Sequence, residues 1–446
     1  MWWSSVAFGF VLSAEVERVS QEVAALSPEA CVPTLEQAFR DLEHLSPAEV
    51  DAADLEANGP SIVERVFAAR LALHERLGAF VAAGTLTDDC MRSVRRADLA
   101  GRYLEDYVLG ALPEEARPSD WLVNPAFSFR GRRDLRSGDV LVTRANALSS
   151  AGIAHMGRVD SQFSHNVLVY VDPADRVWGI MAYLEQGTLV MPMDEFLASG
   201  VDRVVVLRHP DPALAARAGS AAWERVVHGP PIDYDADFDY QDHTSLFCSE
   251  VPRWAFGSLI GQPETIPIPQ ALSVFDRERN AAMFEAMGVA ASLTSAPSDA
   301  LYDPTFAIVA EWRNPDDLVL LRRYDAVVES AMTWMEELQY RIEVQKRHRR
   351  LVEAALLMRR TPLVGRALRK RIHPRGDLAF LVTSLALQDA VTGVKDDLYA
   401  ALAGRPEPIP YDELRAVLEQ VRVDDLERWR ADPESAHFTG LLHPAD

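Results

Sequence analysis

The stretch PPIDYDADFDYQDHTSLFCSE, residues 230–250, places five aspartates ahead of one cysteine, Cys248. Carboxylates at this density could bind calcium, but an EF-hand loop requires a glycine at its sixth position and a glutamate at its twelfth. Counted from Asp233, those positions hold Phe238 and Thr244, and a start at the next aspartate fails in the same way. The alternation of aspartates with mostly aromatic residues instead predicts an extended segment whose carboxylates largely face solvent.

Cys248 is the candidate nucleophile. It stands where the extended run gives way to a predicted helix, with Ser249 and Glu250 in the first turn and Pro252 tolerated there. The positive end of a helix dipole lowers the pKa of a thiol, and the N–H groups at that end can hold an oxyanion. The alternative is an inert buried thiol, which is the usual state of a lone cysteine. A neighbouring base would decide between the two.

A strand-rich segment before Cys248 supplies candidate bases. Its dense valine and isoleucine content and its turn sequences favour an antiparallel sheet, with strands expected in 137–145, 165–172, 176–185 and 202–210 and a last one within 302–317. His165 opens the second of these strands, so it would lie at the rim of the sheet, where a side chain can face a cleft. A structural histidine is the alternative. His243 and His155 are the reserve candidates for the base.

Four pieces of this segment, taken in order, resemble a known family. SGDVLVTR, SHNVLVYVD, MAYLEQGT and IDYDADFDY followed by LFCSE are similar to the circularly permuted papain-like cysteine hydrolases of the YiiX/YebB group, relatives of the NlpC cell-wall peptidases. Histidine ahead of cysteine is the order of a permuted chain, because ordinary papain-like enzymes have the cysteine first. The resemblance covers residues 129–322. It implies an α+β domain with an antiparallel sheet and packed helices.

The resemblance also implies roles for individual residues. Cys248 would be the nucleophile, His165 the general base, and Glu185 the group that orients the imidazole. One departure is Phe247, where the family more often has tyrosine. The substrate cleft would include Tyr234, Asp235 and Ser249, although core packing is an equal alternative for Tyr234.

The expected reaction is attack of the thiolate on an amide, ester or thioester carbonyl, giving an acyl-enzyme that water hydrolyses; it requires no cofactor and no metal. The resemblance suggests two substrate classes. One is peptide amides, including cell-wall stem peptides; the other is acylated lipids, as in the related lecithin:retinol acyltransferase-like branch. Two alternatives come from other classes: a catalytically silent binding module with the same fold, and a helical adaptor in which the middle domain is only a scaffold.

The chain of 446 residues exceeds what one hydrophobic core usually supports, so two or three domains are expected. Helical periodicity runs through residues 33–112, a proline-rich linker follows, and helical periodicity resumes near residue 319. We therefore divide the chain into four parts: a possible leader or apolar helix start in 1–30, a helical region in 31–128, the papain-like domain in 129–322, and a helical C-terminal region in 323–446.

Charge and cysteine content limit the partners. A net charge of −22 argues against nucleic acid. Three scattered cysteines make a zinc site or a disulfide framework improbable. Cys31 and Cys90 are expected to be buried thiols, with pairing as the alternative if the protein is exported. The apolar run at the N-terminus lacks the basic start of a signal peptide. The sequence leaves the compartment open, and a basic segment at 341–375 leans it slightly toward the bacterial periplasm or cell envelope over the cytoplasm.

Residues 341–375 form a basic segment in this acidic chain. They hold twelve lysines and arginines against two glutamates, Glu343 and Glu353. Such a segment could contact an anionic membrane or an anionic envelope polymer. The alternative is that it pairs with the acidic surface of the same chain.

Overall fold

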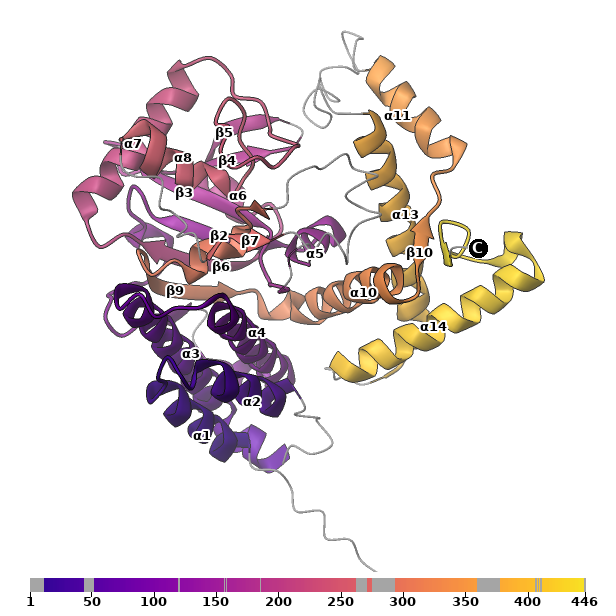
Figure 1. Cartoon of the computed structure of the whole chain (residues 1–446), viewed down its shortest axis with the longest axis horizontal. Coiled ribbons are helices and arrows are strands. Elements are labelled where there is room, and N and C mark those ends of the chain that lie inside the picture. The colour runs from indigo at the N-terminus through magenta and orange to yellow at the C-terminus, as the bar shows by residue number, and fades with distance from the viewer. Residues whose placement is uncertain are drawn as a thin grey trace, which may run out of the picture.

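The computed structural model describes residues 12–43, 52–118, 121–155, 157, 159–184, 186–261, 271–274, 293–358, 378–405, 407, 409 and 411–444. Four helices come first and lie together below the sheet in Figure 1: α1 (Leu12–Ala24), α2 (Cys31–Glu43), α3 (Ala52–Ala82) and α4 (Asp88–Ala111). This confirms the predicted N-terminal helices. A 3-10 turn, Glu114–Ala116, follows in the predicted linker.

A disulfide joins two of these helices. Cys31 at the start of α2 bridges to Cys90 in α4, 59 residues further along the chain. The expectation of two buried thiols is therefore wrong, and the alternative of pairing holds. The bond cross-links α2 and α4, which also pack against each other. It leaves Cys248 as the free cysteine.

Seven strands form one antiparallel sheet in the order β1-β9-β6-β2-β3-β4-β5. Their bounds are β1 (Trp121–Val123), β2 (Val140–Ala145), β3 (His165–Val171), β4 (Val177–Tyr183), β5 (Gly187–Pro192), β6 (Val201–Arg208) and β9 (Ala307–Arg313). The expected strands and the antiparallel sheet are confirmed. The predicted domain boundary at residue 129 differs from the structure, because β1 precedes it and pairs with β9.

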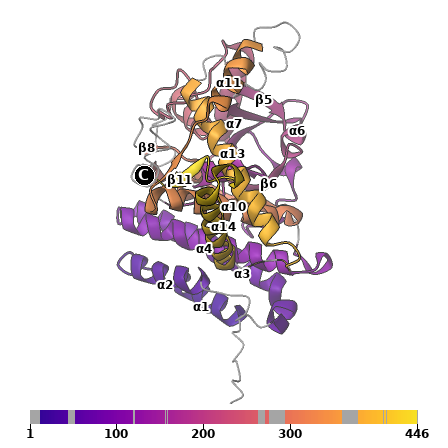
Figure 2. The same cartoon turned by 90° about the vertical axis from the view of Figure 1, so that its right-hand side faces the viewer.

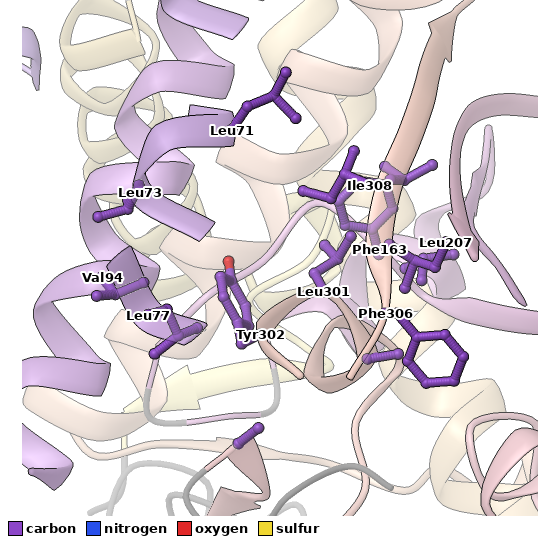
Figure 3. Packing of buried hydrophobic residues seen from close by; sticks show 14 of the residues in the cluster. Leu71, Leu73, Leu77, Val94, Phe163, Leu207, Leu301, Tyr302, Phe306 and Ile308 are labelled. Atoms are coloured by element: carbon purple, nitrogen blue, oxygen red, sulfur yellow. The ribbon is translucent and has the colours of Figure 1, made fainter. Parts of the chain in front are cut away.

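The two faces of the sheet bury different clusters. Alternate residues of β2 and β3 face opposite ways, so Leu168 joins a core with the helices α7 (Pro212–His228) and α8 (Glu250–Trp254), whereas Val167 joins a core with Phe196 of α6 (Met193–Leu197). Figure 3 shows how the first core continues to the N-terminal helices. Its labelled residues from α3 and α4 are Leu71, Leu73, Leu77 and Val94, opposite Phe163, Leu207, Leu301, Tyr302, Phe306 and Ile308.

The C-terminal helices build a third cluster around Trp334 and Phe438. They are α10 (Leu318–Glu337), α11 (Lys346–Met358), α13 (Leu378–Ala401) and α14 (Tyr411–Ala431), and the short α5 (Leu148–Ala154) packs against α10. The helical periodicity that resumes near residue 319 does not form one continuous helix. Gln339 takes a left-handed φ of 56° just after the end of α10, and β10 (Tyr340–Ile342) then pairs with β11 (Leu442–Pro444).

Two further short strands, β7 (Ser273–Val274) and β8 (Leu293–Thr294), pair with each other. Within the described ranges, no helix combines the length and the apolar character that crossing a bilayer requires.

Candidate active site around Cys248

The thiol of Cys248 lies against the first residues of β3. Helix α8 begins at Glu250, which confirms the helix predicted directly after the cysteine. It packs on β3 and β4. The sulfur donates to the carbonyl oxygen of Ser164 at 3.9 Å and is also bonded by the backbone of Asn166. These two residues flank His165. The fold therefore seats the candidate nucleophile on the backbone of the candidate base.

The imidazole of His165 is held away from the sulfur. Its ring stacks on Tyr183 of β4 with centroids 4.9 Å apart, and Phe196 lies 6.1 Å away. Both aromatic residues belong to the core on the Val167 face of the sheet. The Nε2 atom of His165 is buried without a hydrogen-bond partner, and within the described residues no hydrogen bond joins the ring to Cys248. The structure thus brings the two residues together through the backbone, not through their side chains.

Burial sets the protonation state of both groups. It raises the pKa of the Cys248 thiol to about 11, although hydrogen bonds from Asn166 and Ser249 act in the opposite direction. It lowers the pKa of His165 to about 4. The thiol and the imidazole are therefore both neutral at pH 7. The expected lowering of the thiol pKa is wrong, because desolvation by burial outweighs the hydrogen bonds that favour the thiolate.

The aspartate-rich stretch is a loop, not the extended segment that the alternation predicted. Asp235 is buried and accepts hydrogen bonds from the backbone N–H groups of Asp237 and Asp239, both at 2.8 Å. The ends of the loop are joined by two backbone bonds between residues 233–235 and Leu246. Asp237 and Asp239 are exposed, so the prediction that most of these carboxylates face solvent holds. Asp235 instead organises the loop that leads to the cysteine.

A second imidazole, that of His243, connects the end of this loop to α8. His243 Nδ1 lies 2.6 Å from Glu250 Oε1, and Glu250 Oε2 accepts the backbone N–H of Phe247 at 3.3 Å. Glu250 is fully buried, and burial raises its pKa to about 7, against the lowering effect of His243. The carboxyl group thus connects the loop to the residues on either side of Cys248. The motif CSE contained this residue, but nothing in the sequence indicated its partner.

The other predicted residues have mixed positions. Ser249 is buried and its hydroxyl donates to the carbonyl oxygen of Ser295. Tyr234 is half-buried, with its ring edge-on to Phe238 at 6.4 Å. Glu185, the predicted third member of the site, lies outside the described residues.

His155 is unsuited to act as the base. It is fully buried, with Nδ1 at 3.2 Å from Asp160 and Nε2 at 3.6 Å from Asp325 of α10. Burial alone would lower its pKa, but the two carboxylates outweigh burial and raise the pKa to about 10. A permanently charged imidazolium cannot accept a proton at neutral pH. Because His155 caps the C-terminal end of α5, its bonds join α5 to α10.

Two residues beside the thiol were missed. Ser164 and Asn166 both contact Cys248, and the side-chain Oδ1 of Asn166 is buried with no hydrogen-bond partner among the described residues. They are the immediate neighbours of His165 in the motif SHN, so the motif carried the signal. Only the register of β3 decides which atoms of these residues reach the sulfur.

One carboxylate and histidine cluster could be mistaken for a metal site. Asp397, Asp425 and His437 offer ligand atoms within 4.8 Å of one another. Arg428 bonds to both carboxylates, at 2.8 and 2.9 Å, and Asp425 also accepts backbone N–H groups of the chain end. These bonds account for the cluster as a clamp on the C-terminal segment.

Comparisons with protein-family models, with curated proteins and with solved structures find no match for this chain.

Proposed function

We propose that this chain is a cysteine hydrolase with a circularly permuted papain-like domain, in which Cys248 is the nucleophile and His165 the general base. The observation that supports the proposal is the position of the thiol. It contacts Ser164 and Asn166, the two residues that flank His165 in the sequence. The family resemblance implies an α+β domain with an antiparallel sheet and a histidine at the start of a strand; in this chain β3 opens with His165, and the helix that follows Cys248 packs on β3.

The neutral thiol and neutral imidazole define how the reaction begins. A thiol whose pKa is about 11 requires a base as it attacks. The imidazole is unprotonated at pH 7, but a pKa of about 4 makes it a weak base while it is buried, so proton transfer requires the ring to leave its buried stack. The ring of His165 must turn from its stack on Tyr183 toward the sulfur. Because the ring lies on the Val167 face of the sheet and α8 packs on the Leu168 face, this movement requires the start of β3 to change conformation together with the side chain.

The chemistry then balances as an acyl transfer. The sulfur of Cys248 attacks the carbonyl carbon while its proton passes to His165. The bond from that carbon to the leaving nitrogen or oxygen breaks, and the leaving group takes the proton from the imidazolium. Water, deprotonated by the same imidazole, then hydrolyses the thioester and releases the free thiol.

The substrate class is an amide or an acyl ester. A peptide amide, including a cell-wall stem peptide, is our first candidate, and an acylated lipid is the second. The disulfide between Cys31 and Cys90 supports a place outside the reducing cytoplasm, such as the periplasm or cell envelope, because disulfides persist in oxidising compartments.

The test is turnover of a panel of peptidoglycan fragments, acyl esters and phospholipids by the full chain. We expect one class to be hydrolysed, and Cys248→Ala and His165→Ala each to reduce kcat by about a thousandfold or more. His228→Ala is the matched control, because His228 is an exposed histidine of α7. Hydrolysis that persists in Cys248→Ala would refute the proposal, and binding without turnover would favour the silent binding module.

A further inference from the structure

Helix α11 is attached to the molecule by one narrow face. His348 and Val352 are its buried residues. His348 Nε2 lies 3.1 Å from Asp389 of α13, the helix against which α11 packs. Figures 1 and 2 place α11 at the outer end of the C-terminal region, away from the N-terminal helices. Most of the surface of α11 is therefore solvent-facing.

The opposite face of α11 carries large aliphatic side chains. Leu351 is 59% exposed, Leu357 is 66% exposed and Met358 is 44% exposed. Helical spacing of three and four residues puts them on one side of the helix, together with Arg350 and Ala354. Arg347 lies at the edge of this side, where it also reaches Asp389 of α13. Exposed leucines grouped in this way are unusual on a soluble surface and mark an interaction site.

The charges on this face are positive. Lys346, Arg347 and Arg350 are exposed, and the nearby Glu353 is neutralised by Arg349 at 2.9 Å. Arg347 lies 3.4 Å from Asp389, an exposed contact of the kind that contributes little energy. In a chain with a net charge of −22, a basic helix face would be attracted to the protein's own acidic surface, yet α11 points outward.

We propose that α11 binds the surface of an anionic lipid bilayer, with the helix lying in the plane of the interface. Leu351, Leu357 and Met358 would enter the boundary between headgroups and acyl chains, and Arg347 and Arg350 would contact the headgroup phosphates. An anionic polymer would satisfy the arginines but would leave the leucines in water. The combination of exposed aliphatic and basic residues on one face is what selects the bilayer.

The experiment is sedimentation of the full chain with vesicles of phosphatidylcholine alone and of phosphatidylcholine mixed with phosphatidylglycerol. We expect binding to the mixed vesicles only, weakening as salt rises. Leu351→Glu with Leu357→Glu, and separately Arg347→Glu with Arg350→Glu, should each weaken binding by about tenfold or more. Val227→Glu and Arg217→Glu on α7 are the matched controls, since both replace exposed residues of another helix.

Three results would overturn the proposal. Equal binding to vesicles without phosphatidylglycerol would remove the role of charge. Unchanged binding in the double leucine variant would reduce the contact to adsorption of a basic surface, as to any anionic polymer. Equal losses in the α7 controls would place the contact elsewhere. Circular dichroism and thermal unfolding of each variant establish that it is folded, as expected for surface substitutions.

Discussion

Two groups of buried polar residues in this molecule differ in their charge: one consists of paired ions and the other of neutral side chains. The first lies at the seam between the N-terminal helices and β9. Arg70 of α3 bonds to Asp98 at 2.8 Å, to Glu105 at 3.0 Å and to Glu311 of β9 at 2.6 Å. Arg102 bonds to the same Asp98 and Glu311, at 2.8 and 3.0 Å. Every one of these five residues is buried.

The second group is the site around Cys248. Its thiol has only weak hydrogen bonds, His165 Nε2 has no partner among the described residues, and Asn166 Oδ1 has none either. Burial keeps the cysteine and the histidine neutral, whereas at the seam the arginines outweigh burial and hold the pKa of Glu311 well below its usual value.

Burial thus accompanies fully paired charges at the seam and unpaired neutral groups at Cys248. At the seam, opposite charges satisfy one another, so the groups are fixed and have no capacity left for a ligand. At Cys248, neutral groups retain unused donor and acceptor capacity, and under the proposed function a substrate would supply the missing partners. A cavity of about 630 Å³ lies beside the seam and is lined by Glu311, Arg313 and Arg117. Arg313 bonds to Glu105 and Glu311 through Nη2, whereas its Nη1 is buried without a hydrogen bond within the described residues.

The largest expected effect follows from breaking the seam. Glu311→Gln removes the charge that faces three arginines, because Arg313 also bonds to Glu311 at 3.2 Å. We expect the free energy of unfolding to fall by about 3–5 kcal/mol, the usual cost of leaving a buried charge without its partner. Urea unfolding at pH 7 measures it. Glu353→Gln, which breaks an exposed pair with Arg349, should change the same quantity by less than about 1 kcal/mol.

The contribution of Glu311 to stability depends on pH in a definite direction. Since the pKa of folded Glu311 is depressed, its contribution to stability is complete above the unfolded pKa of 4.5 and is lost as pH falls below it. The difference between wild type and Glu311→Gln should therefore shrink in acid. A difference at pH 7 below about 1 kcal/mol would show that the seam is not stabilised by its charges.

The sequence predicted local structure well and the partners of buried groups poorly. The strands were predicted correctly because valine and isoleucine runs bounded by turns are local signals. The helix after Cys248 was predicted from another local signal, the residues of its first turn. The bond from Arg70 to Glu311 joins residues 241 apart, and no periodicity records it. The loop around Asp235 was missed because alternating aspartates are compatible with two structures. One is an extended strand, and the other is a turn in which a buried carboxylate accepts backbone N–H groups.

The position of the His165 ring shows the same limit within the candidate site. The motif SHN placed the residue at the start of a strand, and β3 does begin there. Which way the ring points depends on the register of β3 against β4, where Tyr183 stacks on it. A change of one residue in that register would send the ring to the opposite face of the sheet.

A smaller effect is expected in the alkylation rate of Cys248, which tests whether its thiol is neutral. Because the pKa of Cys248 is raised from 9.0 to about 11, alkylation by iodoacetamide at pH 7 should be about a hundredfold slower than for a thiol with an unshifted pKa. The rate should rise about tenfold per pH unit up to pH 10. Cys248 is the free cysteine, so the labelling is specific to it.

The control for that measurement is His165→Ala, which should leave the pH profile unchanged, since the imidazole and the thiol are not bonded in the resting structure. A plateau of reactivity near neutral pH that disappears in His165→Ala would contradict the resting geometry. It would show instead a thiolate and imidazolium pair already formed before substrate binds.

The smallest expected effect concerns Glu250, which lies between the two extremes because it is buried like the thiol but has one partner, His243. Burial raises the pKa of Glu250 from 4.5 to about 7, so the folded state holds more protons than the unfolded state between those values. Stability must then fall as pH rises through this window, by about 2 kcal/mol for this group. In Glu250→Gln that part of the pH dependence should vanish, because the amide does not titrate. Urea unfolding of both proteins at pH 5 and pH 7.5 gives the two differences, and identical slopes would mean that Glu250 is already ionised and paired with His243 at the lower pH.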